Sequence, residues 1–392
     1  MRYARMTDRL AGLGSDKWVL HVAAQARAAA GHRILNLTIG EPDMPTPAAL
    51  IDAACTAMRE GRTHYSNGRG EESLLRALAA RHSQRLGRPV GTDRFLCLPG
   101  TQTALYLIFQ ALCEPGDEVI LGDPMYATYE GLVRASGAVP VPVTLRDTAG
   151  FRLQAEDVEA AITPSTRVIF INTPHNPTGA ILGPAELDAL GELARRHDLW
   201  IVSDEVYGDL THDGRPFTSA LANPAFEERT IVAASISKSH AAPGFRSGWA
   251  CGPAAFCARA LPLSETMLFG SQPFIADMTA RALSAPPDLA RAMAARMARR
   301  ARIVRDALDG VAGMRVPLPE AGMFALIDIR ALSRDSTAFA LELLERQDVA
   351  VMPGASFGAA LEGWLRVALN ASDEDTATAC ARIRRFAEVM AA

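Results

Sequence analysis

The hydrophobic pattern in the middle of the chain alternates between short apolar runs and amphipathic stretches. Short β-branched or apolar runs occur at residues 95–98, 118–121, 168–171, 200–202 and 231–233, and the last three begin 32 and 31 residues apart. This spacing is long enough for a strand, a crossover helix and the return to a parallel neighbour. Residues 184–197 fit such a helix, because Pro184 stands near its start and Leu187, Leu190 and Leu193 recur on one face. The pattern predicts an α/β fold with a mostly parallel central sheet sandwiched by helices.

The pattern changes after residue 270. An Ala- and Arg-rich helical stretch runs to Leu308 and is interrupted at Ala285-Pro286-Pro287. Short strands are expected at residues 324–328, 349–351 and 365–369, and helices at 337–346 and 373–390. The first 45 residues show no sheet pattern of their own. We expect a large α/β domain at residues 46–285 and a smaller α+β domain made of residues 1–45 and 286–392.

Polar clusters follow the predicted strands. Residues 99–102 open an amphipathic helix, residues 172–179 read NTPHNPTG, residues 203–207 read SDEVY, and Ser235, Ser237, Lys238 and Arg246 follow the last strand. A strand, a glycine turn and a helix start make an anion site, because free N–H groups and the helix dipole point outward. Each cluster alone has an ordinary structural explanation.

Taken together, the clusters indicate a functional site rather than a series of ordinary turns. The carboxyl ends of parallel strands meet at one edge of a sheet, so these side chains are expected to lie close together. This set of groups suits a phosphate-bearing cofactor with a cationic ring and an aldehyde. It comprises a helix start that binds anions, an aspartate, a tyrosine, two serines, a lysine and an arginine. Pyridoxal 5′-phosphate (PLP) meets that description.

Composition excludes several other classes of protein. The chain has 40 basic and 44 acidic residues, a formal charge of −4 and no basic excess, which argues against a nucleic-acid partner. No apolar run reaches the roughly 18 residues of a membrane span, and the N-terminus lacks the apolar region of a secretory signal. The six cysteines show no paired spacing and the eight histidines no ligand cluster. We therefore expect a cytoplasmic protein without a metal site.

Eight ordered blocks resemble the fold-type I, class I aminotransferases over nearly the whole chain. They are LTIGEPDMPTP (37–47), HYSNGRG (64–70), PGTQTAL (99–105), PGDEVILGDPMYATYEG (115–131), NTPHNPTGA (172–180), SDEVY (203–207), SISKSHAAPGFRSGW (235–249) and LRVAL (365–369). The resemblance implies PLP as cofactor and an enzyme that exchanges an amino group between an L-amino acid and a 2-oxo acid by a ping-pong mechanism. It also implies a homodimer with the active site shared across the interface.

The same resemblance assigns roles to individual residues. Lys238 would bind the cofactor as a Schiff base and move the proton during catalysis, and Asp204 would pair with the pyridinium nitrogen. Asn176 and Tyr207 would hydrogen-bond the ring oxygen, and Tyr126 would stack on the ring.

Further residues are implied to hold the phosphate and the substrate. Those for the phosphate are Thr101, Gln102, Ser235, Ser237 and Arg246, with Tyr65 reaching the phosphate of the partner subunit. Arg366 would bind the substrate α-carboxylate, helped by Gly40 and Asn176. His240, two residues after the lysine, fits a structural role as well as a contact with cofactor or substrate.

The donor amino acid is less clearly indicated. Dicarboxylate-specific relatives need a second cation, placed either within residues 265–272 or at the helix start where this chain has Thr101 and Gln102, and neither cation is present. Residues 237–249 and 267–275 resemble the arginine–pyruvate transaminase branch. A cationic donor would need a carboxylate near the pocket mouth, and Asp16 and Glu265 are candidates.

Two alternatives share most of these residues. A PLP-dependent C–S lyase would use the same lysine, aspartate and phosphate site, and it would release pyruvate without an added oxo acid. A PLP-sensing transcription regulator would need an N-terminal DNA-binding domain, for which the blocks beginning at residue 37 leave no room; the net charge disfavours it too.

Overall fold

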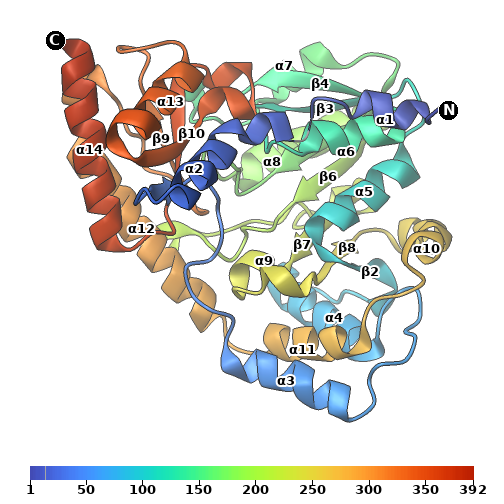
Figure 1. Cartoon of the computed structure of the whole chain (residues 1–392). Helices are drawn as coiled ribbons and strands as arrows, with labels where there is room; N and C mark the ends of the chain where they lie inside the picture. Colours follow the sequence, from blue (N-terminus) through green and yellow to red (C-terminus); the bar gives the residue numbers. More distant parts are fainter. Residues whose placement is uncertain (14) are drawn as a thin grey trace.

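The larger sheet has seven strands in the order β2-β8-β7-β6-β5-β3-β4 (Figure 1). The structure, a computed structural model, describes residues 1–13 and 15–392, and only the backbone of Ser15 and Asp16. The strands are β2 (Phe95–Leu98), β3 (Glu118–Asp123), β4 (Val139–Thr144), β5 (Thr166–Asn172), β6 (Trp200–Asp204), β7 (Thr230–Ser235) and β8 (Gly248–Cys251). Strands β3 to β7 pair with one another in parallel, and β8 is antiparallel to its neighbours β2 and β7. The predicted α/β fold with a mostly parallel sheet is confirmed.

Helices cover both faces of this sheet, because its strands are apolar on both sides. Val168 and Phe170 of β5 pack with α5 (Gly100–Leu112), α6 (Tyr129–Ser136) and α10 (Ala254–Leu268). Ile169 and Ile171 face the other way, towards α7 (Ala155–Ala161) and α8 (Pro184–Arg196). On that second face β2, β7 and β8 are covered by α3 (Ala48–Arg59), α4 (Glu72–Leu86) and α11 (Pro273–Ser284). The two buried faces explain the continuous apolar runs in the sequence.

A second sheet has the order β1-β10-β11-β9, formed by β1 (Leu35–Leu37), β10 (Val349–Pro353), β11 (Trp364–Ala368) and β9 (Phe324–Asp328). It packs against α2 (Val19–Ala29), α12 (Asp288–Leu308), α13 (Ser336–Gln347) and α14 (Asp373–Ala391). The first 45 residues show no sheet pattern in the sequence, but they contribute the short strand β1, which pairs in parallel with β10. From the two sheets we propose that residues 46–285 form the larger domain and that residues 1–45 and 286–392 together form the smaller one.

A connecting segment, residues 38–47, joins β1 to α3 and is held by side chains of the smaller domain. Asp43 pairs with Arg300 at 2.7 Å and with Arg296 at 2.6 Å. Arg300 is only 2% exposed, and it also pairs with Asp373 at 3.0 Å and donates to the carbonyl of Leu369. A buried cation is tolerated here because two carboxylates and a carbonyl surround it.

We predict that Arg300→Leu destabilises the chain by about 3 kcal/mol, since it leaves a buried carboxylate with one partner fewer. The neighbouring Arg299→Leu is the matched control, because Arg299 is exposed and pairs only with Asp373. It should change stability by about 0.5 kcal/mol or less. Denaturant unfolding of both variants measures the difference. An equal decrease in the free energy of unfolding would show that the buried ion pair stabilises the chain no more than the exposed one.

Candidate active site

The polar clusters that follow separate strands meet in one cavity of about 350 Å³ at the carboxyl edge of the larger sheet. The smaller sheet and the connecting segment close its other side. The lining residues are Trp18, Ile39, Gly40, Thr101, Gln102, Leu105, Tyr126, Tyr129, Asn176, Asp204, Val206, Tyr207, Ser235, Ser237, Lys238, Pro243, Arg246, Phe324 and Arg366. Every predicted site residue is among them except Tyr65.

Lys238 is one of only two lysines in a chain with 38 arginines. It lies in the short helix α9 (Ile236–Ser239) directly after β7, and its Nζ donates to the carbonyl of Gly40 at 2.7 Å. Burial lowers the pKa of Lys238 from 10.5 to about 8, and the nearby cations Arg246 and Arg366 act in the same direction. An amine that is partly uncharged near neutral pH can act as nucleophile and base, which a guanidinium cannot do.

Asp204, the last residue of β6, is buried and held from two sides. Its Oδ2 accepts a hydrogen bond from Tyr129 Oη at 2.7 Å, and its Oδ1 accepts from the backbone N–H of Val206 at 3.0 Å. Burial raises the pKa of Asp204 to about 6, while these two donors favour the ionised form. Each oxygen keeps a free lone pair, so the carboxylate can accept a further proton donor from the cavity.

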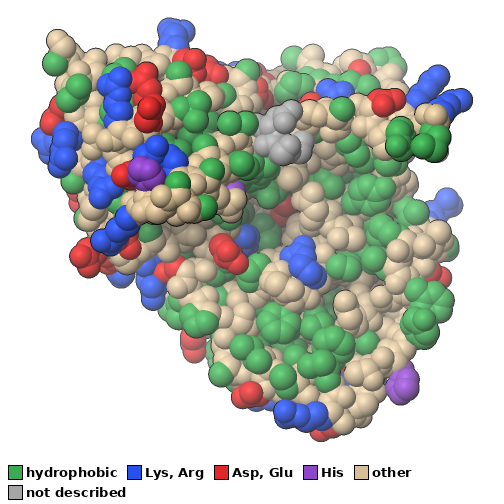
Figure 2. All heavy atoms as spheres, in the orientation of Figure 1, with side chains coloured by type: hydrophobic (Ala, Val, Ile, Leu, Met, Phe, Trp, Pro, Cys, Tyr) green, Lys and Arg blue, Asp and Glu red, His purple; other side chains and the backbone are tan. Residues whose placement is uncertain are grey.

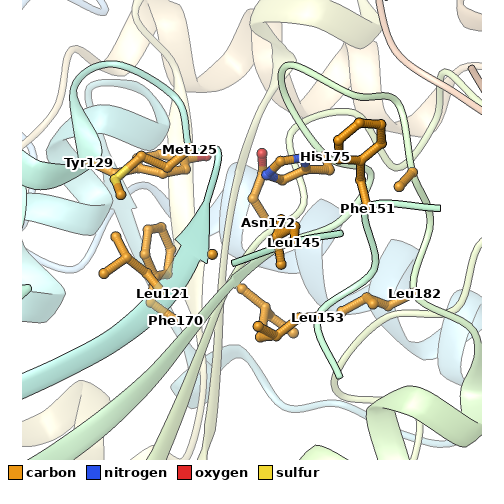
Figure 3. A pocket seen from close by; sticks show the side chains of 13 residues that line it. Leu121, Met125, Tyr129, Leu145, Phe151, Leu153, Phe170, Asn172, His175 and Leu182 are labelled. Carbon is orange, nitrogen blue, oxygen red and sulfur yellow. The ribbon is translucent and has the colours of Figure 1, made fainter. Parts of the chain in front are cut away.

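Tyr129 is a site residue that the sequence interpretation missed, although it lies within the block at residues 115–131. Its ring also lines a second, smaller cavity of about 30 Å³. Figure 3 shows Tyr129 and Phe170 on one side of this cavity and His175 and Phe151 on the other, with Asn172 between them. Tyr129 packs edge-on against Phe170, with ring centroids 4.7 Å apart, and this packing fixes the direction of its hydroxyl.

The start of α5 forms an anion cradle. Gly100 has φ +84°, and a Cβ there would lie 2.3 Å from Arg246 Nη2, so the turn needs glycine to admit the guanidinium. Thr101 Oγ1 is buried without a hydrogen-bond partner among the described residues. Ser235 caps α9 by accepting from the backbone N–H of Ser237. An orphaned hydroxyl, a helix start and an arginine fit a phosphate group.

Arg366 on β11 forms the opposite wall and is 1% exposed. Its Nη1 donates to Asn176 Oδ1 at 3.2 Å and its Nη2 to the carbonyl of Thr38. Its Nε is buried without a partner among the described residues. Burial lowers the pKa of Arg366 to about 9. A guanidinium that lines the cavity and keeps one N–H group without a partner in the described chain is suited to bind a carboxylate.

The remaining predicted residues lie between these walls. Asn176 is held by Asn172, whose Oδ1 accepts from its backbone N–H at 2.8 Å. Burial raises the pKa of Tyr207 and of Tyr126, so both hydroxyls stay protonated donors at neutral pH. Gln102 Oε1 accepts from Thr128 at the cavity rim.

Three described residues considered from the sequence do not line the cavity. Tyr65 is 89% exposed and stacks against the exposed ring of Phe269, with centroids 4.9 Å apart. Glu265 lies against Gly68, beside the same exposed pair. His240 hydrogen-bonds Ser239 and the carbonyl of Ala282, which supports its structural role. The side chain of Asp16 lies outside the described residues.

The donor set fits PLP. The phosphate would lie at the start of α5 between Thr101, Arg246 and the serines, the ring beside Tyr126, and its nitrogen at Asp204. Within residues 1–13 and 15–392, no three His, Cys, Asp or Glu side chains group closely enough to hold a metal ion. Nor is any helix in these ranges long and apolar enough to cross a membrane.

Comparison with known proteins agrees with this geometry. The family model described as aminotransferase class I and II matches residues 32–383. Arginine–pyruvate transaminase AruH of Pseudomonas aeruginosa is 44% identical over 98% of this chain and 97% of its own, and an aspartate aminotransferase of Geobacillus stearothermophilus is 33% identical over 94% and 95%. The solved structure of Thermus thermophilus aspartate aminotransferase with maleate superposes with a TM-score of 0.91 at 32% identity, covering 98% of this chain and 100% of its own.

We predict that Lys238 of the cofactor-free protein is half-modified by a neutral amine-reactive reagent near pH 8 rather than 10.5, because burial favours the uncharged amine. Arg246→Gln should raise this midpoint, since it removes a like charge. Mass spectrometry across a pH series follows the modification, and Lys17, the only other lysine, serves as internal reference in every digest. A midpoint above pH 10 would contradict the electrostatic account.

Proposed function

The chain belongs to the class I and II aminotransferases, enzymes that depend on pyridoxal 5′-phosphate, and we propose that it moves the amino group of L-arginine to pyruvate. The observation that carries this substrate pair is the 44% identity, over nearly the full length of both chains, to a protein named for that reaction.

The charges of the cavity support a donor other than a dicarboxylate. The basic residues among the described residues that line the cavity are Lys238, Arg246 and Arg366. The first would bind the cofactor, the second its phosphate and the third the α-carboxylate that every amino acid carries. No further described cation lines the cavity to bind a second carboxylate, whereas the apolar side chains of Trp18 and Ile39 can pack along the methylene stem of a longer donor.

The residues divide the chemistry between them. PLP, when bound, supplies an aldehyde that takes up the amino group and a ring that accepts electrons. Lys238 Nζ would take the proton from the Cα of the donor and pass it to the aldehyde-derived carbon of the cofactor, which its lowered pKa permits. Asp204 would keep a proton at the ring nitrogen, and Asn176 and Tyr207 would donate to the ring oxygen. Arg366 and the backbone of Gly40 orient the donor so that its Cα–H faces the lysine.

We propose that the enzyme is a homodimer in which Tyr65 completes the partner's site. Large hydrophobic side chains are exposed at Ile51, Met58, Tyr65 and Phe269, and Figure 2 shows hydrophobic side chains over α3 and α11 on one face. An aromatic pair exposed this far is unusual for a monomer and typical of an interface.

Single-turnover absorbance changes of the loaded enzyme should rank L-arginine above alanine, aromatic amino acids and aspartate, by about tenfold or more over aspartate. Each donor is mixed at equal concentration and the loss of the cofactor band is followed. A faster reaction with aspartate would overturn the proposed donor while leaving the aminotransferase assignment intact.

Mixing two inactive variants tests the shared site. We predict that Lys238→Ala and Tyr65→Ala, each inactive or weak alone, regain activity when unfolded and refolded together. In a mixed dimer one site combines the intact lysine of one protomer with the intact tyrosine of the other. Refolding each variant alone is the control. Activity that stays at the level of the separate variants would argue against Tyr65 serving the partner.

A further inference from the structure

The guanidinium of Arg366 lies between two phenyl rings. Its Cζ is 4.0 Å from the ring centroid of Phe324 and 4.2 Å from that of Phe357. The rings come from different elements, since Phe324 begins β9 and Phe357 ends the short helix η8 (Gly354–Phe357). Both are almost completely buried, and so is the arginine. A planar cation stacked on two π faces gains electrostatic stabilisation from each.

Arg366 differs from the other fully buried arginine in what surrounds its charge. Arg300 is paired with Asp43 and Asp373. No carboxylate among the described residues forms an ion pair with Arg366, whose polar partners are a backbone carbonyl and an amide oxygen. Burying a cation without an acid is costly, and the two rings reduce that cost without neutralising the charge.

We propose that Phe324 and Phe357 form an aromatic clamp that positions Arg366 and keeps its charge available for the α-carboxylate of the donor and of the oxo acid. The clamp takes the place of the two aspartates at Arg300, where the charge is neutralised within the protein. This inference rests on the proposed function, because it takes Arg366 to be the residue that binds the substrate carboxylate.

Contacts of the two rings tie the clamp to the rest of the site. A Cβ on Gly40 would lie 2.2 Å from Phe324 Cζ, so the backbone of Gly40 and the guanidinium of Arg366 rest on the same ring. The carbonyl of Phe357 accepts from the backbone N–H of Met125 at 2.7 Å, next to Tyr126. The clamp therefore joins the smaller sheet to the loop that carries the ring-stacking tyrosine.

Phe357→Leu is the sharpest test, because Phe357 does not line the cavity and a leucine keeps the site apolar. We expect the KM for every amino acid and oxo acid to rise roughly threefold to thirtyfold, with kcat changed much less. The slow half-reaction with a simple alkylamine, which has no carboxylate, should keep its wild-type rate. Phe339→Leu is the matched control, a buried phenylalanine of the same domain that packs on Phe386 instead.

Arg366→Lys separates the clamp from the proposed function. It should raise the same KM values further, because an ammonium loses the two-pronged fit to a carboxylate. If Arg366→Lys raises them but Phe357→Leu behaves like Phe339→Leu, the clamp is wrong and the role of Arg366 stands. If Arg366→Lys leaves KM unchanged, both fail. A Phe357→Leu enzyme that loses the alkylamine reaction as well would show a general packing defect and overturn the clamp.

Discussion

The active site depends on charges that the protein buries without neutralising them. Lys238 donates only to a carbonyl, Arg366 to a carbonyl and an amide, and Asp204 accepts from a tyrosine and a backbone N–H. None of the three forms an ion pair within the described part of the chain. Neutral partners fix their positions but leave their charge uncompensated, and this is why each can interact strongly with a ligand. Burial of apolar side chains on both faces of the sheet offsets the free energy lost by burying these charges.

Both sheets are needed to assemble this arrangement. The larger one brings the ends of β5, β6 and β7 to one edge, where the lysine, the aspartate and the asparagine meet. The smaller one adds the guanidinium opposite them. Residues 38–47 run between the two and supply the carbonyls of Thr38 and Gly40, one to each cation. Their anchor, Asp43 on Arg300, lies outside the cavity, so the position of both carbonyls depends on an ion pair that touches no ligand.

The sequence predicted the strands and helices that have a clear hydrophobic pattern of their own. It missed strands that form only because they pair with neighbouring strands in the folded chain. The runs that became β2 and β9 were placed to the residue, because both faces are buried. The missed strands are β1, which has only three residues, β4, which alternates valine with proline at a sheet edge, and β8, which starts with glycine. Motif blocks located the residues that line the cavity. Tyr129 lies within a motif block and Phe324 within a predicted strand, but neither was assigned a role from the sequence, because their importance lies in what they contact.

Burial also suggests how one framework serves relatives named for different amino donors. Groups suited to the cofactor or to the parts that all substrates share, such as Asp204, Asn176 and Arg366, are deeply buried and tied to several elements. Changing any of them leaves buried polar groups unpaired and costs stability. A residue at the cavity rim such as Gln102 is exposed and makes few contacts within the described chain. Substitutions there cost little stability, so donor preference can diverge at the rim while the buried charges and the fold stay the same.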